Sequence, residues 1–415
     1  MTDFFDALET RSQDERNAAQ MAVLPAQIAH AKSNTKAFAE LLRDVDPDSI
    51  NSLYALAQLP VIRKSELLER QQANRSQDPF GGFSAVVRGP EMQRIFASPG
   101  PIYEPEGTTK DYWRTARALF AAGFRQGDLV HNAFSYHMTP GAFILESGAM
   151  ALGCTVFPAG TGQTEQQLQA MTELCPAAYT GTPSFLRILV EKAIESGRDI
   201  SSLKKASVSG EAFPPSLCQW LAEQGITGYQ SYATADLGMI AYETAAREGL
   251  LIDEGVIVEI VRPGTGDVLP DGEVGEVVVT TLNTAYPLIR FGTGDLSAIL
   301  PGTCPTGRTA RRIKGWMGRA DQTTKVRGMF VHPAQVAEIS KRFEAVTKAR
   351  LVVSGEMSND QMCLKVETAT PSEDLAKALA DAVRDITKLR ADVDMVACGT
   401  LPNDGKVIED ARSYE

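Results

Sequence analysis

The chain has 415 residues, of which 43% are hydrophobic and 22% are charged, and its formal net charge at pH 7 is −11. This composition is ordinary for a globular protein of two or three domains, and the acidic balance disfavours a nucleic-acid partner, which would need a basic face. The best candidate for a membrane span, residues 142–154, is interrupted by Glu146, and the N-terminus lacks the pattern of a signal peptide. Six cysteines lie far apart with no CxxC pair, which favours reduced thiols and a cytoplasmic location.

The larger part of the chain predicts an α/β domain. Residues 14–42 carry mixed apolar and charged positions with few helix breakers, which predicts a helical opening within residues 1–82. From about Leu119 onward, strand-like runs such as 128–136 alternate with stretches of helical spacing such as 183–197. This alternation predicts βαβ units around a largely parallel sheet, in which ligands bind at the carboxyl ends of the strands.

The pattern changes near Asp253 and again near residue 318. Residues 255–282 contain two β-rich runs separated by a turn region, which predicts two antiparallel strands and a β-rich subdomain. Residues 372–386 predict a helix with Ser372 as its N-cap, because the apolar positions fall on one face. Strands predicted at 349–355, 362–368 and 393–399 complete a small α+β domain over residues 318–415, which follows a large multi-layer domain over residues 1–317.

Three short motifs carry residues suited to nucleotide chemistry. In residues 286–297 an apolar run predicts a strand followed by a Gly-Thr-Gly-Asp turn, in which Asp295 could accept two hydrogen bonds from a ribose diol, although such turns are common without any function. At the predicted domain boundary, Arg319 and Asp321 suit either a hinge facing a ligand or a solvated linker. Lys406, in a glycine turn near the C-terminus, is either a point charge for an anionic ligand or a surface lysine.

Together and in this order, the three motifs resemble the phenylacetate-CoA ligase family of the adenylate-forming superfamily of acyl-CoA synthetases. The resemblance implies an α/β fold with a mobile C-terminal lid domain. It also implies ATP, Mg²⁺ and CoA as cofactors and an aromatic or arylalkyl carboxylic acid as substrate. It covers nearly the whole chain, and further similar segments are residues 48–67, 132–142, 159–169, 180–185, 207–213 and 228–238.

The family works in two half-reactions: the acid attacks the α-phosphate of ATP to give an acyl-adenylate and pyrophosphate, and the CoA thiol then displaces AMP. The resemblance implies that Lys406 bridges the two anionic reactants during adenylation. It likewise implies that Asp295 binds the ribose hydroxyls and that Arg319 approaches the same nucleotide region.

The lid is implied to rotate about a hinge at Asp321 between the half-reactions. This rotation would exchange Lys406 for the strand that follows the hinge, which contains Lys325 and ends at Gly328. One site would then serve both reactions.

The resemblance implies an adenine-binding turn at Gly210 and Glu211, with Tyr232 as the aromatic residue near the base. Asp236 stands where the family has a glutamate that contacts magnesium. Asp is one methylene shorter but remains a hard oxygen ligand for Mg²⁺. Ala233 and Ala235 depart from the motif.

The family's phosphate loop corresponds to residues 98–105, and this chain departs from it. Ser98 and Gly100 remain as nucleotide-binding residues, but the next residue is a proline without a backbone N–H. Glu104, in place of a lysine, and Glu106 would repel phosphate unless Mg²⁺ or a change of rotamer intervenes. The phosphate grip is therefore either rebuilt, with the Thr-Thr-Lys run that follows as replacement donors, or weakened. We expect a working enzyme with a high KM for MgATP.

The acyl pocket is implied at Tyr136, His137 and Gly160, with a structural histidine in a strand-end loop as the alternative for His137. Many relatives carry a structural zinc site. Zinc needs four tetrahedral ligands, and only one remains here, so no zinc is expected. The four matching positions read Thr244, Leu251, Cys304 and Thr306.

Three functions stay open at this point. The first is an acid–CoA ligase acting on an aromatic or arylalkyl acid. The second keeps adenylation but passes the acyl group to a carrier protein or an amine. The third is a nucleotide- or CoA-binding protein without catalysis. The resemblance also implies a homodimer.

Overall fold

A computed structural model of the chain describes residues 3–99, 101–320, 322–355, 359–402 and 406–412. The contacts separate two compact units, one up to Met317 and one from Gly318 onward. Each unit has its own hydrophobic core.

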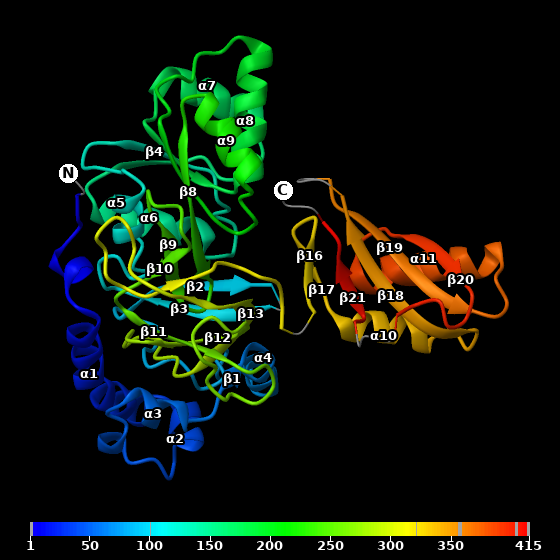
Figure 1. The fold of residues 1–415 in the computed structure, drawn as a ribbon, viewed down its shortest axis with the longest axis horizontal. Coiled ribbons are helices and arrows are strands. Elements are labelled where there is room, and N and C mark those ends of the chain that lie inside the picture. The colour runs from blue at the N-terminus through cyan, green and yellow to red at the C-terminus, as the bar shows by residue number, and fades with distance from the viewer. Residues whose placement is uncertain (1–2, 100, 321, 356–358, 403–405, 413–415) are drawn as a thin grey trace. The chain divides into compact units, whose positions relative to one another are not determined.

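The larger unit contains the βαβ layer that the alternating sequence pattern predicts (Figure 1), and the predicted α/β fold is confirmed. Five strands pair in parallel, in the spatial order β5 (Thr155–Pro158), β4 (Leu129–Asn132), β6 (Ala178–Gly181), β7 (Lys205–Val208) and β8 (Thr227–Thr234). The helix α5 (Ala116–Ala121) precedes β4, and the connections are α6 (Gly141–Ala151), α7 (Thr164–Leu174), α8 (Pro183–Ser196) and α9 (Pro215–Glu223).

Beyond β8 the same sheet continues with antiparallel strands, which connect the βαβ half of the unit to its β-rich half. The added strands, in spatial order, are β9 (Gly238–Glu243), β10 (Leu250–Ile252), β15 (Arg312–Ile313) and β14 (Ile299–Leu300).

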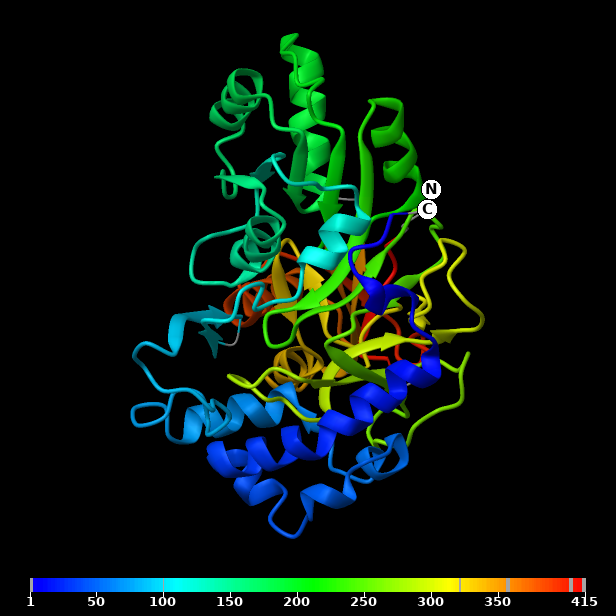
Figure 2. The same ribbon diagram turned by 90° about the vertical axis from the view of Figure 1, so that its left-hand side faces the viewer.

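A second sheet carries the predicted antiparallel pair, β11 (Val256–Val261) with β12 (Gly275–Thr281). The strand β13 (Phe291–Ser297) pairs with β12, and β1 (Ile62–Arg63) pairs in parallel with β13, with Ile62 opposite Phe291 and Arg63 opposite Gly292. Buried side chains of this sheet pack against those of the N-terminal helices. Figure 2 shows these helices, drawn in blue, next to the strands of the β-rich half. The N-terminal elements are η1 (Ala7–Thr10), α1 (Gln13–Asn34), α2 (Lys36–Leu41), η2 (Pro47–Ser49), α3 (Leu53–Ala57) and α4 (Lys64–Ala73).

The strand predicted within residues 286–297 is shifted toward the C-terminus. The Gly-Thr-Gly-Asp run lies inside β13 rather than in a turn after it. The register of β12 against β13 shifts between Glu276 and Val278, and Gly294 has a φ of +73°. A β-bulge with a left-handed glycine therefore accommodates the sequence that resembles a turn.

Arg290, just before β13, is a buried cation that ties three segments together. Its Nε lies 2.9 Å from Glu259 Oε2, and its other nitrogens donate to the carbonyl oxygens of Ala57, Leu59 and Gly266. The ion pair with several added hydrogen bonds satisfies a charge that would otherwise be costly to bury. It fixes the segment that leads into β1 against the sheet.

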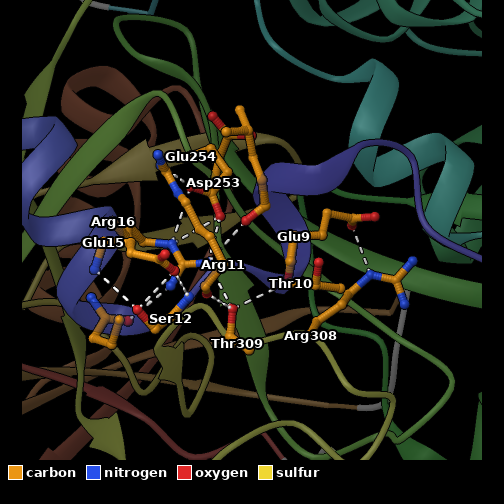
Figure 3. A network of polar contacts seen from close by, with 12 residues as sticks. Glu9, Thr10, Arg11, Ser12, Glu15, Arg16, Asp253, Glu254, Arg308 and Thr309 are labelled. Carbon is orange, nitrogen blue, oxygen red and sulfur yellow. Dashed lines mark hydrogen bonds and ion pairs between the residues drawn. The ribbon is translucent and has the colours of Figure 1, made fainter.

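The N-terminal segment is fastened to the loop before β15 by a buried polar network (Figure 3). Glu9 accepts from Arg308 Nε at 2.7 Å and from the Tyr242 hydroxyl at 3.0 Å. The side chains of Glu9 and Arg308 are 1% and 5% exposed. Nearby, Arg16 forms a 2.9 Å ion pair with Glu254. The network matters for stability because a single substitution would leave the remaining partner as an unpaired buried charge.

The predicted phosphate loop is mostly a β-hairpin. The strands β2 (Met92–Ser98) and β3 (Ile102–Gly107) pair with Ser98 opposite Ile102, which leaves residues 99–101 as the connection. Most of residues 98–105 therefore lie in paired strands, and every residue of β3 except Tyr103 is buried.

The smaller unit is the α+β structure that the sequence predicts. Its four-stranded sheet has the spatial order β20 (Asp392–Val396), β19 (Gln361–Thr368), β18 (Val346–Ser354) and β21 (Ile408–Asp410). In the helix α11 (Glu373–Thr387) the Ser372 hydroxyl accepts from the N–H of Leu375 at 3.1 Å, which confirms the N-cap. A hairpin of β16 (Thr324–Val326) and β17 (Met329–Val331) and the helix α10 (Pro333–Lys341) precede them.

No helix within the described ranges is long and apolar enough to cross a membrane. All six cysteines lie in those ranges, and each is a free thiol.

Candidate active site

Asp295 and Tyr232, both predicted at the nucleotide, come together between β13 and β8. The Tyr232 hydroxyl donates to Asp295 Oδ2 at 2.8 Å, and Trp316 Nε1 donates to Asp295 Oδ1 at 3.1 Å. The Asp295 side chain is half-buried and Trp316 is 46% exposed. A half-buried carboxylate aimed by two donors can take ribose hydroxyls as further or replacement donors. The site is thus accessible from solvent.

The turn after β7 carries the predicted adenine residues. Gly210 has a φ of +84°, which favours glycine. Glu211 is exposed, and its Oε1 accepts from the backbone N–H of Ser184 at 2.8 Å, in the first turn of α8. A carboxylate there is stabilised by the helix dipole. The turn lies at the carboxyl end of the parallel strands, where this class of sheet binds ligands.

Asp236 has a cationic partner that the sequence did not reveal. Lys64 Nζ lies 2.8 Å from Asp236 Oδ2, although 172 residues separate the two positions. The Asp236 side chain is 1% exposed and that of Lys64 is 32% exposed. Lys64 is the first residue of α4, directly after β1. In this ion pair the carboxylate is therefore buried, whereas the lysine side chain is partly exposed to solvent.

The two glutamates of the hairpin are both buried, and each has polar partners. Glu106 is paired with Arg94 at 2.8 Å and with Trp113 Nε1 at 3.0 Å. Glu104 is 0% exposed and accepts a hydrogen bond from the Ser98 hydroxyl. Burial, reinforced by the nearby charge of Asp236, raises the pKa of Glu104 to about 8, while Lys64 and Ser98 oppose the rise.

Two of the three predicted acyl-pocket residues, Tyr136 and Gly160, contact the buried Asn132 at the end of β4. Asn132 Nδ2 donates to the Tyr136 hydroxyl at 2.8 Å, and the Asn132 carbonyl accepts from the N–H of Gly160 at 3.0 Å. The Tyr136 hydroxyl donates to Glu146 at 2.5 Å, and burial raises the pKa of Tyr136. His137 is exposed. Tyr136 is therefore held by the side-chain amide of Asn132 and Gly160 by its backbone carbonyl, whereas His137 lies outside this group.

The remaining predicted residues belong to the smaller unit. Lys325 is exposed on β16, and Gly328 has a φ of +82° in the turn to β17. Arg319 is half-buried and Lys406 is exposed. Gly100 of the larger unit and Asp321, the predicted hinge, lie outside the described residues.

Three positions of the family's zinc site do meet in space. The Cys304 thiol lies 3.4 Å from the Thr244 hydroxyl and 3.1 Å from the Thr306 hydroxyl, and Leu251 packs in the same buried cluster. Within the described ranges, no group of three or more His, Cys, Asp or Glu side chains could hold a metal. Weak hydrogen bonds and apolar packing occupy the place of the metal cross-link.

Comparison with known proteins decides the family. The chain is 34% identical over 380 residues to phenylacetate-coenzyme A ligase of Aromatoleum evansii, a match that spans 87% of this chain and 84% of the relative. It is 32% identical to phenylacetate-coenzyme A ligase of Escherichia coli K12, over 97% of this chain and 95% of the relative. The chain belongs to the phenylacetate-CoA ligase family. A model of the AMP-binding enzyme family also matches residues 136–286.

Solved structures extend the comparison to the fold of this phenylacetate-CoA ligase family member. A 2-hydroxyisobutyryl-CoA ligase, crystallised with 2-HIB-AMP and CoA, superposes with a TM-score of 0.80 at 26% identity, covering 98% of this chain and 92% of that one. The amide bond synthetase McbA of Marinactinospora thermotolerans has a TM-score of 0.52 at 17% identity, a likeness that concerns the fold alone.

For this family member, sequence reasoning missed Lys64, Trp316 and Asn132. The motifs around Asp236 and Asp295 were visible, but their partners lie 172 and 21 residues away in the chain. One signal in the sequence pointed to Lys64, because it is the lysine that follows Pro60 within residues 48–67, one of the segments that resemble the family. Asn132 lies at the carboxyl end of a parallel strand, where such sheets gather ligand residues.

Proposed function

We propose that this chain is an AMP-forming acid–CoA ligase that joins an aromatic or arylalkyl carboxylic acid to CoA through an acyl-adenylate. Membership of the phenylacetate-CoA ligase family supports the reaction class. The observation that carries the proposal for this chain is the Tyr232–Asp295 pair, because it sets an oriented, half-exposed carboxylate beside an aromatic ring in the place where the family binds the nucleoside.

In the first half-reaction the acid carboxylate attacks the α-phosphate of ATP and pyrophosphate leaves. Two anions must approach each other, so a positive charge between them lowers the barrier. Lys406 is the proposed source of that charge, while Asp295 and Arg319 position the nucleoside. Gly210 and Glu211 form the turn against adenine, and their place at the carboxyl end of the parallel strands supports this role.

ATP is used with Mg²⁺, which neutralises phosphate charge when bound. The residues fit such an ion: Asp236 Oδ1 is buried and has no hydrogen-bond partner within the described part of the chain, and a carboxylate is a hard oxygen ligand. Asp236 would hold Mg²⁺ through that oxygen, while Lys64 occupies the other oxygen and faces solvent with part of its side chain.

In the second half-reaction the CoA thiol attacks the acyl carbon and AMP leaves. We propose that the smaller unit rotates about Asp321 between the two steps, so that Lys406 gives way to Lys325 and Gly328. The resemblance to the family supports this exchange, and the turn conformation of Gly328 suits a close backbone approach to a ligand.

The relatives are named for two different kinds of acid substrate. The relatives at 30–34% identity are phenylacetate-CoA ligases, whereas the solved relative at 26% identity is named for 2-hydroxyisobutyrate. The test is incubation with MgATP, CoA and a panel containing phenylacetate, benzoate and 2-hydroxyisobutyrate, with AMP and thioester both measured. We expect both products with an aromatic acid. AMP without thioester would favour a carrier protein or an amine as acceptor, and nucleotide binding without AMP would favour a non-catalytic binding protein.

We also propose a cytoplasmic location and a homodimer. The free state of all six cysteines supports a reducing compartment. The homodimer rests on the family resemblance, and light scattering during size exclusion would test it by giving about twice the 44.8 kDa chain mass.

A further inference from the structure

Trp316, a residue 46% exposed near the end of the larger unit, contacts the carboxylate that is proposed to bind the ribose. Its Nε1 donates to Asp295 Oδ1 at 3.1 Å, while the Tyr232 hydroxyl donates to Asp295 Oδ2 at 2.8 Å. Each carboxylate oxygen therefore accepts one donor from the chain, and an oxygen that holds one donor can accept a second. The two donors differ, because a phenol hydroxyl can rotate and accept, whereas an indole N–H only donates.

The main chain around Trp316 is fastened to β13, the strand that carries Asp295. Two backbone N–H groups of the segment donate toward the end of the strand, and one hydroxyl of the strand donates back. These bonds join the Lys314 N–H to the Ala298 carbonyl at 2.9 Å, the Met317 N–H to the Leu296 carbonyl at 2.9 Å, and Ser297 Oγ to the Gly315 carbonyl at 2.7 Å. Because the bonds fall on both sides of Trp316 in the chain, they fix the start of its side chain relative to Asp295.

The main chain of Asp295 is held as well. Its N–H donates to the Thr293 hydroxyl at 3.1 Å, and that hydroxyl donates to the Val277 carbonyl on β12 at 3.0 Å. With the backbone fixed in this way, the orientation of the carboxylate depends on the donors at its two oxygens. Removing the donor at one oxygen would let the carboxylate rotate away from the orientation that serves two hydroxyls of one ribose.

We propose that Trp316 is a positioning residue that acts through Asp295 and sets the preference of the site for ribonucleotides over 2′-deoxyribonucleotides. The inference deepens the proposed function and rests on it for the identity of the nucleotide. A ribose offers two adjacent hydroxyls and a 2′-deoxyribose only one of them, so a carboxylate in a fixed orientation gains a second hydrogen bond from the ribose alone. Since Met317 is the last residue of the larger unit, the ribose contact depends on the stretch that leads into the smaller unit.

The test compares the Kd of AMP with that of 2′-deoxyAMP by isothermal titration calorimetry at pH 8, without acid or CoA. We expect the wild-type chain to bind AMP at least about tenfold more tightly, and Trp316→Phe to reduce this ratio to about threefold or less, because phenylalanine keeps a ring but has no N–H. Trp316→His should restore the ratio, since imidazole Nε2 can take the place of indole Nε1 as donor. Trp220→Phe, the same substitution on α9, is the matched control and should leave the ratio unchanged.

A double-variant cycle separates an action through Asp295 from a direct contact of the indole with the nucleotide. In the Asp295→Ala background, Trp316→Phe should change the Kd of AMP by less than about twofold, because the group through which Trp316 acts is already removed. An equal loss in both backgrounds would overturn the proposal and make Trp316 a direct nucleotide contact. Should Trp316→Phe not fold, Trp316→Leu replaces it with the same expectations.

The outcomes also separate this inference from the proposed function. AMP formation from an acid together with an unchanged ratio in Trp316→Phe rejects the positioning role alone. A reduced ratio without AMP formation from any acid rejects the proposed function alone. A wild-type chain that binds no AMP rejects both.

Discussion

Replacing Arg308 by alanine should destabilise the larger unit strongly, because it leaves Glu9 as a buried anion. Among the residues that the structure describes, Glu9 would keep two neutral donors, the Tyr242 hydroxyl and the N–H of Phe5. Removing one partner of a buried ion pair costs about 3–5 kcal/mol. With an unfolding entropy of about 2.1 cal/mol/K per residue, the 317 residues of this unit give about 0.67 kcal/mol/K, so the loss lowers its Tm by about 4–8 °C.

The assay can follow this unit alone in the intact chain. The three tryptophans, Trp113, Trp220 and Trp316, all lie before Gly318, so a thermal scan of tryptophan fluorescence reports the larger unit. The control is Arg187→Ala, which breaks an exposed ion pair with Glu191 and should lower Tm by about 1 °C or less.

Removing both charges should be milder than removing one. The double variant Glu9→Gln with Arg308→Met should recover part of the Tm lost in Arg308→Ala, because no buried charge remains unpaired. A drop in Arg308→Ala no larger than that of the control would refute the reasoning, and would mean that solvent reaches Glu9 when Arg308 is removed.

Three further predictions concern the site. Lys406→Ala should slow acid-dependent ATP–pyrophosphate exchange by about 10²–10³-fold while thioester formation from supplied acyl-adenylate changes much less; an equal loss in both assays would contradict its role. Asp295→Ala should raise the KM for ATP by about tenfold or more, since hydrogen bonds to a charged group contribute about 1.5–3 kcal/mol each, and an unchanged KM would leave Asp295 a purely structural acceptor. Because the pKa of Glu104 is raised to about 8, the folded chain binds more protons there than the unfolded chain between about pH 4.5 and 8, so stability should fall as pH rises through that window and then level off. Urea unfolding at pH 6.5, 7.2 and 8 should show a slope of up to about 1.4 kcal/mol per pH unit that is absent in Glu104→Gln, and identical slopes in the two chains would argue against a buried, protonated Glu104.

Local sequence pattern was sufficient for much of the fold. The alternation of strand and helix periods predicted the parallel layer, and Ser372 marked a helix start because a hydroxyl at the N-cap satisfies a free backbone N–H. The start of β13 and the hairpin β2–β3 were not predictable in the same way. Gly294 and Pro101 are turn-forming residues by local preference, but the neighbours of Gly294 pair with β12, and those of Pro101 pair with each other across the hairpin.

The candidate site likewise contains residues that the sequence could identify and contacts that it could not. Asp236 and Asp295 were identified because each lies within a short motif, whereas Lys64 reaches Asp236 only through the folded chain. The burial of Glu104 was hidden for a related reason. A glutamate in a run of glycine and proline favours an exposed turn, and its interior position depends on Ser98 across the hairpin.

The parallel pairing of β1 with β13 fixes the relative positions of the residues that follow each strand start. Because Arg63 is opposite Gly292, the backbone sets the spacing between Lys64 and Asp295, and Arg290 pins the segment in front of both strands. One residue inserted or deleted in either strand would shift this register and so change the position of Lys64 relative to Asp295. Chimaeras that graft a relative's segment onto this chain should therefore keep residues 60–64 and 290–295 from a single parent, since a junction inside either segment would change the pairing that relates Lys64 to Asp295.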